Sequence, residues 1–174
     1  MPTENNKHQT SIDLLNKAVG SEIAVSMQYM YFHVHCADRG YEYLAKMFHR
    51  ISIAEMKHIE QLSERILFLE GDVNMNPAYK VRQIRDVKGM LALSAELESK
   101  TIEEYNAASR ACSEARDAIS HRMFQDLVGE EEEHLDRFRT ELDNMNDYGD
   151  NYLVLQSVAD SKAYAKHGPD HEDD

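Results

Sequence analysis

Four long stretches of the chain place apolar residues three and four positions apart, which is the period of an amphipathic α-helix. Only 3 prolines and 7 glycines interrupt the 174 residues, so the composition also favours long helices over a sheet. Gly40 and Arg116 are placed to end the first and third helices. The expected helices cover about residues 11–38, 41–70, 87–115 and 117–145. Four such helices predict an all-α four-helix bundle.

The links between these helices predict how they are connected. The first two helices and the last two have short links, so each pair is expected to form an antiparallel hairpin. Residues 71–86 are a long non-helical connection, expected to cross the length of the bundle between the second and third helices. Residues 151–162 predict a short fifth helix with too little apolar surface for the core, which indicates an assembly element. We therefore expect a flexible N-terminus over residues 1–10, one domain over residues 11–162 and an acidic, disordered tail over residues 163–174.

Each apolar stripe is interrupted near its middle by glutamate or by glutamate and histidine. The stripes of the first two helices read Leu15, Ala18, Glu22, Val25, Tyr29, Phe32, Cys36 and Leu44, Phe48, Ile51, Glu55, His58, Leu62, Ile66. Those of the next two read Leu91, Ala95, Glu98, Ile102, Tyr105, Cys112 and Ile119, Met123, Leu127, Glu131, His134, Phe138, Leu142. The spacing between the stripes is the same in both halves of the chain: Glu55 follows Glu22 by 33 residues, as Glu131 follows Glu98. In each half a tyrosine lies 7 residues, and a cysteine 14 residues, after the leading glutamate, Glu22 or Glu98. The bundle is therefore expected to be a duplicated hairpin.

The six polar residues of these stripes favour a buried site for two metal ions. A buried carboxylate without a partner is strongly destabilising, and no Lys or Arg lies on the stripes to neutralise the glutamates. Within residues 55–58 and 131–134, glutamate and histidine lie one helical turn apart on one face, which suits a single ion. Oxygen-rich ligation with one imidazole per ion fits iron or manganese better than a structural zinc. The expected arrangement has Glu22 and His58 terminal on one ion, Glu98 and His134 terminal on the other, and Glu55 and Glu131 bridging.

The charge and cysteine counts disfavour several other classes of protein. With 19 basic and 32 acidic residues the formal net charge is −13, so cations are more suitable partners than nucleic acid or an anionic membrane. No stretch approaches the ~20 apolar residues of a membrane span, and residues 1–10 lack the apolar segment of a signal peptide, so we expect a cytoplasmic protein. Cys36 and Cys112 are too few for a disulfide framework, and both are expected to be reduced.

Several runs around these residues make the chain similar to the bacterioferritins from about residue 12 to residue 158. The similar runs are residues 28–29, 52–58, 64–71 and 130–134. The resemblance implies a ferritin-like bundle that holds two iron ions, and a homo-oligomeric shell of about 24 subunits built from dimers. It also implies ferroxidase activity, in which Fe(II) is oxidised by O₂ or H₂O₂ and stored as ferric mineral. A ferredoxin-type reductant is a further expected partner.

The resemblance also assigns a role to Met56, which directly follows Glu55 and is expected to project away from the core. A second apolar stripe, off the core of the first helix, comprises Ile23, Met27, Met30 and Val34. Such a face indicates a subunit interface. Spacing alone favours an interface in which Met56 packs against the other subunit without a cofactor. Bacterioferritins place their haem-ligating methionine at the position of Met56, so the resemblance implies one haem per subunit dimer, held by two copies of this residue.

Tyr29 has a family precedent as an electron relay, although a core tyrosine bonded to a carboxylate fits its position equally well. Some bacterioferritins carry a further pair of iron ligands on their inner surface, a histidine and an aspartate that precede the second-helix glutamate. Arg50 and Ala54 stand at those two positions in this chain. The accessory iron site is therefore expected to be absent.

Two alternative functions compete with iron storage. A di-iron peroxidase of the rubrerythrin type normally adds a module with four cysteines, and this chain has 2. A helical assembly protein without iron storage would have to bury six polar residues with no cation among them. An iron titration followed by absorbance distinguishes these alternatives from a ferroxidase.

Overall fold

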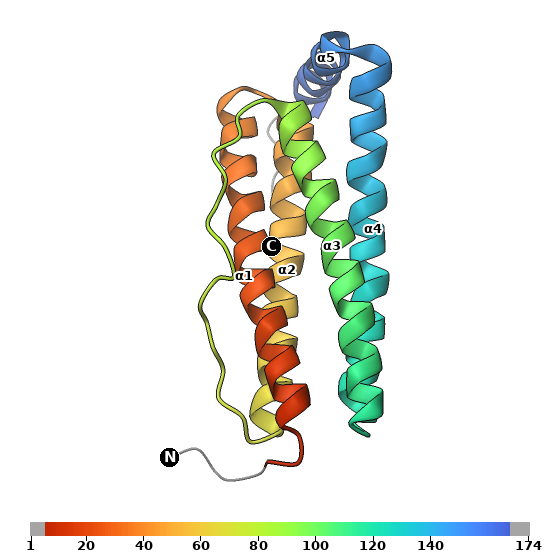
Figure 1. Ribbon diagram of the computed structural model, residues 1–174. Coiled ribbons are helices and arrows are strands. Elements are labelled where there is room, and N and C mark those ends of the chain that lie inside the picture. Colours follow the sequence, from red (N-terminus) through yellow and green to blue (C-terminus); the bar gives the residue numbers. More distant parts are fainter. Residues whose placement is uncertain (1–5, 168–174) are drawn as a thin grey trace.

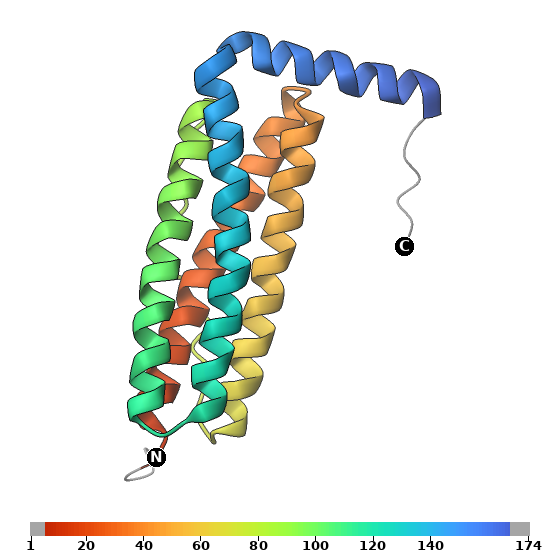
Figure 2. The same cartoon turned by 90° about the vertical axis from the view of Figure 1, so that its right-hand side faces the viewer.

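The computed structural model describes residues 6–167, which form five helices and no strand (Figure 1). The helices are α1 (Gln9–Asp38), α2 (Glu42–Phe68), α3 (Val87–Glu114), α4 (Ala118–Tyr148) and α5 (Asp150–His167). The first four form a four-helix bundle, and α5 lies across one end of it, as the turned view in Figure 2 shows. This confirms the predicted all-α bundle with a fifth helix. Among the described residues, no helix has both the length and the apolar character that a membrane crossing requires.

The bundle consists of two antiparallel hairpins joined by a long crossover. Residues 39–41 link α1 to α2, residues 115–117 link α3 to α4, and the two helices of each pair pack together. The crossover, residues 69–86, runs along α1 from one end of the bundle to the other (Figure 1). Helices α2 and α3 are therefore parallel, whereas α1 and α3 are antiparallel, as the long connection predicts.

Residues of α1 hold the crossover in place. The side-chain amide of Gln28 donates to the carbonyl of Arg82 at 3.0 Å and accepts from the N–H of Arg82 at 2.7 Å. The carbonyl of Gly20 accepts from the N–H of Ala78 at 2.8 Å. A Cβ at Gly20 would lie 3.0 Å from the carbonyl oxygen of Asn76, so the close approach of the two backbones favours glycine there. These contacts with the backbone of the crossover order a segment that has no helix or sheet of its own.

Aspartates begin both helices of the second hairpin. The carboxylate of Asp86 accepts from the backbone N–H of Gly89 at 2.6 Å, and that of Asp117 accepts from the N–H of Ser120 at 3.1 Å. Each bond satisfies a backbone donor that the first turn of a helix leaves free. Asp117 also lies 2.6 Å from Nη2 of Arg65 on α2. The start of α4 is thereby tied to the first hairpin.

Apolar side chains pack in two clusters along the bundle, with a layer of polar side chains between them. The first cluster includes Tyr29, Phe32, Cys36, Phe48 and Phe138. The second includes Leu15, Leu62, Tyr105, Cys112 and Phe124. Cys36 and Cys112 are both buried and free, which agrees with the expectation that they are reduced.

The predicted core faces of α1 and α2 are confirmed, because every residue on those two stripes is buried. The stripe of α4 is wrong at Ile119, which is 59% exposed. Ile119 is the second residue of α4, two positions after the capping Asp117, at the end of the bundle. Phe124, which the predicted stripe omits, is fully buried and fills the core at this level.

The fifth helix is longer than the sequence pattern predicts. It continues to His167, so residues 163–167, assigned to a disordered tail, are helical. The apolar pattern stops near Val158, but the alanines and lysines that follow are strong helix formers and extend the helix without it. Residues 1–5 and 168–174 lie outside the described residues. Most of the N-terminus and tail that were expected to be flexible belongs to these two segments.

Candidate metal centre

The six predicted metal ligands meet at mid-bundle, in the polar layer between the two apolar clusters. They are Glu22 from α1, Glu55 and His58 from α2, Glu98 from α3, and Glu131 and His134 from α4. Five of them are at most 2% exposed, and the side chain of His134 is 14% exposed. Each helix presents its donors on the buried stripe, one helical turn apart where there are two. Regular helix register therefore brings together residues that are far apart in sequence.

The donor atoms fall into two overlapping groups, each compact enough for one ion. One group comprises Glu22, Glu55, His58 and Glu131, and the other comprises Glu55, Glu98, Glu131 and His134. Within each group, one donor atom from every residue lies within 4.8 Å of the others. Glu55 and Glu131 belong to both groups, whereas Glu22 and Glu98 each belong to one.

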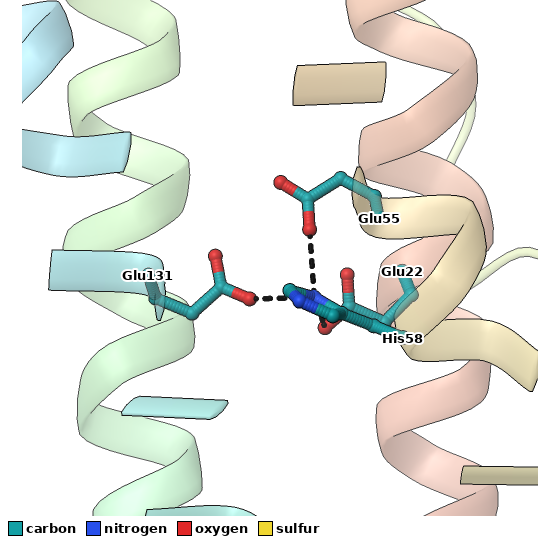
Figure 3. Close-up of side chains that lie close together, drawn as sticks. All are labelled: Glu22, Glu55, His58 and Glu131. Atoms are coloured by element: carbon teal, nitrogen blue, oxygen red, sulfur yellow. Dashed lines mark ion pairs between the residues drawn. The ribbon is translucent and has the colours of Figure 1, made fainter. Parts of the chain in front are cut away.

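Each of the two shared carboxylates lies within ion-pair distance of both imidazoles. Oε2 of Glu55 lies 2.9 Å from Nδ1 of His58, and its Oε1 lies 3.1 Å from Nδ1 of His134. Oε1 of Glu131 lies 3.1 Å from Nδ1 of His58, and its Oε2 lies 3.4 Å from Nδ1 of His134. Figure 3 shows the carboxylates of Glu55 and Glu131 pointing toward His58, with Glu22 beside it. Two carboxylates in this position are suited to bridge two ions.

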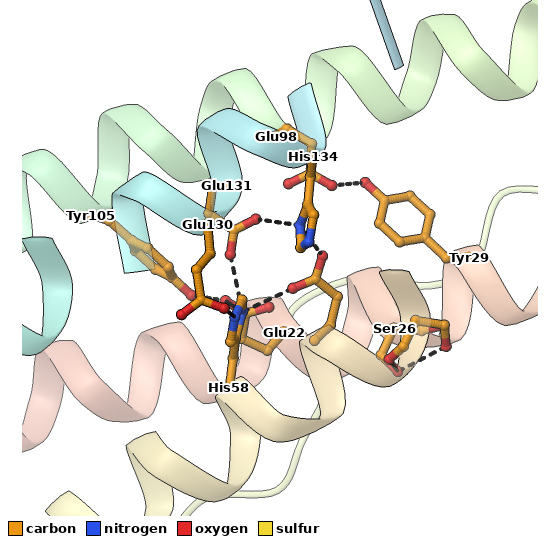
Figure 4. A network of polar contacts seen from close by, with 11 residues as sticks. Glu22, Ser26, Tyr29, His58, Glu98, Tyr105, Glu130, Glu131 and His134 are labelled. Carbon is orange, nitrogen blue, oxygen red and sulfur yellow. Dashed lines mark hydrogen bonds and ion pairs between the residues drawn. The ribbon is translucent and has the colours of Figure 1, made fainter. Parts of the chain in front are cut away.

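Two tyrosines hold the remaining two glutamates. The hydroxyl of Tyr29 on α1 donates to Glu98 on α3, and the hydroxyl of Tyr105 on α3 donates to Glu22 on α1 (Figure 4). Both tyrosines are buried, so the bonds lie inside the core. Tyr29 is a predicted site residue. Tyr105 is its equivalent in the second repeat, and the sequence places it in register without assigning it a role.

One residue of the network was missed from the sequence. Nε2 of His58 lies 3.0 Å from Oε2 of Glu130, whose side chain is 53% exposed. Glu130 begins the acidic run 130–133, and an outward-facing acid in such a run is typical of a solvated helix face. No pattern in the sequence separates Glu130 from its exposed neighbour Glu132.

Burial and mutual charge determine how the centre holds protons. Burial, together with the charges of Glu55 and Glu131, raises the pKa values of Glu22 and Glu98 well above the usual range. Burial opposes protonation of His134, but its carboxylate neighbours more than offset this and raise its pKa to about 10. The pKa of His58 is raised in the same way. Without a metal ion, the centre therefore compensates its crowded carboxylates with protons.

Several of these buried atoms have no hydrogen-bond partner within residues 6–167. They include both oxygens of Glu55, Oε2 of Glu98, Oε1 of Glu131, and Nδ1 of His58 and His134. The oxygens of Glu55 and Glu131 approach Nδ1 of the two histidines at ion-pair distance but without the geometry of a hydrogen bond. A cation between them would give each atom a partner, so the donor set fits a metal ion chemically.

Comparisons with known proteins agree with this geometry. The family model of the ferritin-like domain matches residues 12–147. The bacterioferritin of Desulfovibrio desulfuricans is 33% identical over 143 residues, which cover 82% of this chain and 80% of that protein. The bacterioferritin of Streptomyces coelicolor is 30% identical over 159 residues, which cover 91% of this chain and 94% of that one. The chain belongs to the bacterioferritin family.

The similarity to a bacterioferritin extends to the three-dimensional structure. An X-ray structure of the Desulfovibrio desulfuricans bacterioferritin, which describes its diiron site in different catalytic states, matches this chain with a TM-score of 0.85. The sequence identity is 31%, and the match covers 88% of this chain and 91% of that one. All six candidate ligands fall within the part of the chain that matches the ferritin-like domain.

Met56, the residue at which a bacterioferritin is expected to bind haem, lies outside the metal centre. Its side chain is 51% exposed, and Ile53 on the same helix is 37% exposed. On α1, Met27 from the predicted second stripe is 54% exposed. Ser52 does not share this face, because it is buried and its hydroxyl donates to the carbonyl of Ser26 at 3.0 Å. The side chains exposed around Met56 thus include Ile53 but not Ser52.

Proposed function

We propose that this member of the bacterioferritin family stores iron as a ferroxidase, which oxidises Fe(II) at the six-residue centre and deposits ferric mineral inside a shell of about 24 copies. The observation that carries the proposal is the position of Glu55 and Glu131, each of which faces both imidazoles and belongs to both donor groups. The diiron site of the similar Desulfovibrio desulfuricans protein supports iron as the metal.

The donor set suits two ions of the same kind. We assign Glu22 and His58 to one ion, Glu98 and His134 to the other, and Glu55 and Glu131 to both. Carboxylate oxygens favour hard cations, and one imidazole per ion favours iron over calcium or magnesium. Two Fe(II) supply the two electrons that reduce one O₂ to H₂O₂, or one H₂O₂ to two water molecules.

The chain itself positions the ions and controls their surroundings. The apolar clusters on both sides of the polar layer limit the access of water, which strengthens the attraction between carboxylates and cations. Tyr29 and Tyr105 hold Glu98 and Glu22 by hydrogen bonds and so restrict the positions of these two carboxylates. Tyr29 is also our candidate for an electron relay to the centre, since it contacts the centre directly.

Exposed apolar surface supports assembly into a shell. Besides Met27 and Met56 on the first hairpin, Val154 and Leu155 on α5 are 60% and 63% exposed. Apolar patches at two separate places are more readily explained by two kinds of contact between copies than by a monomer. The net charge of −13 per chain would attract Fe(II) to such a shell. We place the shell in the cytoplasm, with a ferredoxin-type reductant as the partner that releases iron.

Met56 is our candidate ligand for haem between two subunits. Its exposed thioether lies on an apolar face, and a haem bound there would be covered when a second copy packs against it. Two thioether ligands favour the reduced state of haem iron, which suits delivery of electrons for iron release. The haem would therefore serve iron release and would not be needed for Fe(II) oxidation.

The bridging assignment can be tested with the Glu55→Ala and Glu131→Ala variants. We expect each variant to lose rapid Fe(II) oxidation, followed by absorbance of the ferric product, and to keep its helical content and its assembly. Glu132→Ala is the matched control, because Glu132 is an exposed acid on the same helix as Glu131. Oxidation at the wild-type rate in both test variants would refute the assignment. A wild type that consumes H₂O₂ but retains no iron would instead favour the peroxidase.

A further inference from the structure

The two histidines of the centre differ in what lies behind them. His58 directs Nδ1 toward the carboxylates of the centre, and its Nε2 lies 3.0 Å from Oε2 of Glu130 (Figure 4). His58 is fully buried, so Nε2 has no access to bulk water. An imidazole that offers the lone pair of Nδ1 to a metal carries its proton on Nε2, and that proton needs an acceptor. Glu130 reaches in from the exposed side of α4 and supplies it.

The internal repeat shows that the second histidine has no such acceptor. Glu130 directly precedes Glu131, and the equivalent position on α2, directly before Glu55, is occupied by Ala54. His134 contacts Glu55 and Glu131 through Nδ1. In the described part of the chain, no acceptor meets its Nε2. Glu55 and Glu131 thus contact both imidazoles alike, while the groups behind the imidazoles differ.

We propose that Glu130 is a positioning residue that makes the two metal positions unequal, so that the ion held by Glu22 and His58 binds first and more tightly. The proposal rests on the proposed function, because it presupposes a metal at each position. A carboxylate behind a ligating imidazole fixes its tautomer and its orientation and makes the nitrogen that faces the metal a better donor. Within residues 6–167, no carboxylate lies behind the imidazole of His134 to supply these three effects.

Orientation and charge are separable contributions of Glu130. A glutamine at this position keeps an oxygen that can accept from His58 and removes the negative charge. An alanine removes both the acceptor and the charge. Glu132, an exposed acid two residues further along α4, has no polar contact within residues 6–167, so Glu132→Ala is a control for charge alone. Loss of affinity that is specific to Glu130 therefore cannot come from the general field of the acidic run.

Titration of the metal-free protein with Co(II), followed by the visible absorption of the bound ion, measures both positions. We expect the wild type to bind two Co(II) in two resolved steps. Glu130→Ala should weaken the first step about 10- to 100-fold, change the absorption spectrum of the first ion and bring the two steps together. The first-step affinity of Glu130→Gln should lie between those of the wild type and Glu130→Ala. Glu132→Ala should match the wild type.

The possible results separate this inference from the proposed function. Two equal steps in the wild type, or a Glu130→Ala variant with the affinities and spectrum of the wild type, would overturn the role of Glu130 and leave the metal centre in place. A wild type that binds no Co(II) at the centre would contradict the proposed function itself. Circular dichroism and gel filtration of each variant show whether a change in affinity follows from loss of fold, and a folded Glu130→Gln variant keeps the test decisive if Glu130→Ala does not assemble.

Discussion

The hydroxyl of Tyr105 donates a hydrogen bond to Glu22, which lies 83 positions earlier in the chain. Tyr29 and Glu98 are joined in the same way from the opposite half of the bundle. Each tyrosine follows the leading glutamate of its own repeat and bonds to the leading glutamate of the other. The two hydrogen bonds therefore connect α1 to α3, the pair of helices at the seam between the hairpins.

Replacing either tyrosine with phenylalanine should destabilise the metal-free protein. Each change leaves a buried carboxylate without its donor, which costs on the order of 1–3 kcal/mol in the free energy of unfolding. Urea unfolding at fixed protein concentration measures this loss. If Tyr29 is also an electron relay, Tyr29→Phe should slow Fe(II) oxidation more than Tyr105→Phe does. Equal rates in the two variants and the wild type would leave Tyr29 with a structural role only.

Asp117 should stabilise the fold in a pH-dependent way. Burial opposes its ionisation, but hydrogen bonds from Ser120 and the contact with Arg65 lower its pKa from 3.8 to about 2. A carboxylate with a depressed pKa in the fold contributes stability above its unfolded pKa and loses it as the pH falls toward the folded one. Asp117→Asn should cost about 2 kcal/mol at pH 7 and little near pH 2.

Asp126→Asn is the control for this change. Asp126 pairs with Arg122 at 3.8 Å on the surface of α4, where both side chains are more than two-thirds exposed. Exposed pairs of this kind contribute little to stability. Chemical unfolding at several pH values should therefore separate Asp117→Asn from the wild type and should not separate Asp126→Asn. A pH-independent difference would show that the charge of Asp117 is not the cause.

Neither cysteine should react in the native protein. Burial raises the pKa of Cys36 to about 11 and also raises that of Cys112, so little thiolate exists near neutral pH and reagents cannot reach it. A chromogenic disulfide reagent should detect no thiol in the folded protein and both thiols in guanidinium chloride. A native mass that lacks two protons relative to the reduced chain would reveal a disulfide and contradict the topology.

Metal binding should release protons and become tighter as the pH rises. Neighbouring carboxylates raise the pKa values of His58 and His134 above neutrality, so an ion must displace a proton from each imidazole at pH 7. Each displaced proton changes the apparent affinity about tenfold per pH unit. Calorimetric titration with Co(II) in two buffers of different ionisation enthalpy measures the number released. Identical heats in both buffers would contradict this protonation state.

Met56→Leu should abolish haem binding and leave the metal centre unaffected. Leucine keeps the apolar character of the exposed face but has no thioether sulfur. Haem added to the wild type should give a low-spin absorption spectrum at one haem per dimer, and the variant should not reproduce it. Met27→Leu, on the neighbouring exposed surface of α1, controls for changes in packing. An unchanged haem spectrum in Met56→Leu would show that Met56 is not the ligand.

The sequence predicts that the six polar side chains meet inside the bundle, because their positions follow helix periodicity. Glu22, Glu55 and Glu131 lie on stripes that are apolar apart from the ligand residues themselves, so their burial follows from spacing alone. The duplication then pairs each residue with an equivalent in the other half. Roles that depend on the metal, such as bridging, follow from chemistry rather than from pattern.

The periphery is less predictable, for physical reasons that differ from place to place. The direction in which Glu130 reaches depends on the position of His58 on another helix, which periodicity along α4 cannot show. Ile119 fits the apolar stripe, but it lies in the first turn of α4 at the end of the bundle, where its side chain stays 59% exposed. The length of α5 depends on helix propensity after its apolar pattern has ended.

Neither hairpin carries a full donor group, since each group takes one shared carboxylate from α2 and one from α4. Two copies of a single hairpin, related by a two-fold axis, would present the same six donors. Duplication and fusion of a gene for one such hairpin would account for the repeat. The crossover is then the segment that fusion required, and it is the part of the bundle with no equivalent in the other half. An ancestral dimer of hairpins would have needed only half as much coding sequence to hold a pair of metal ions.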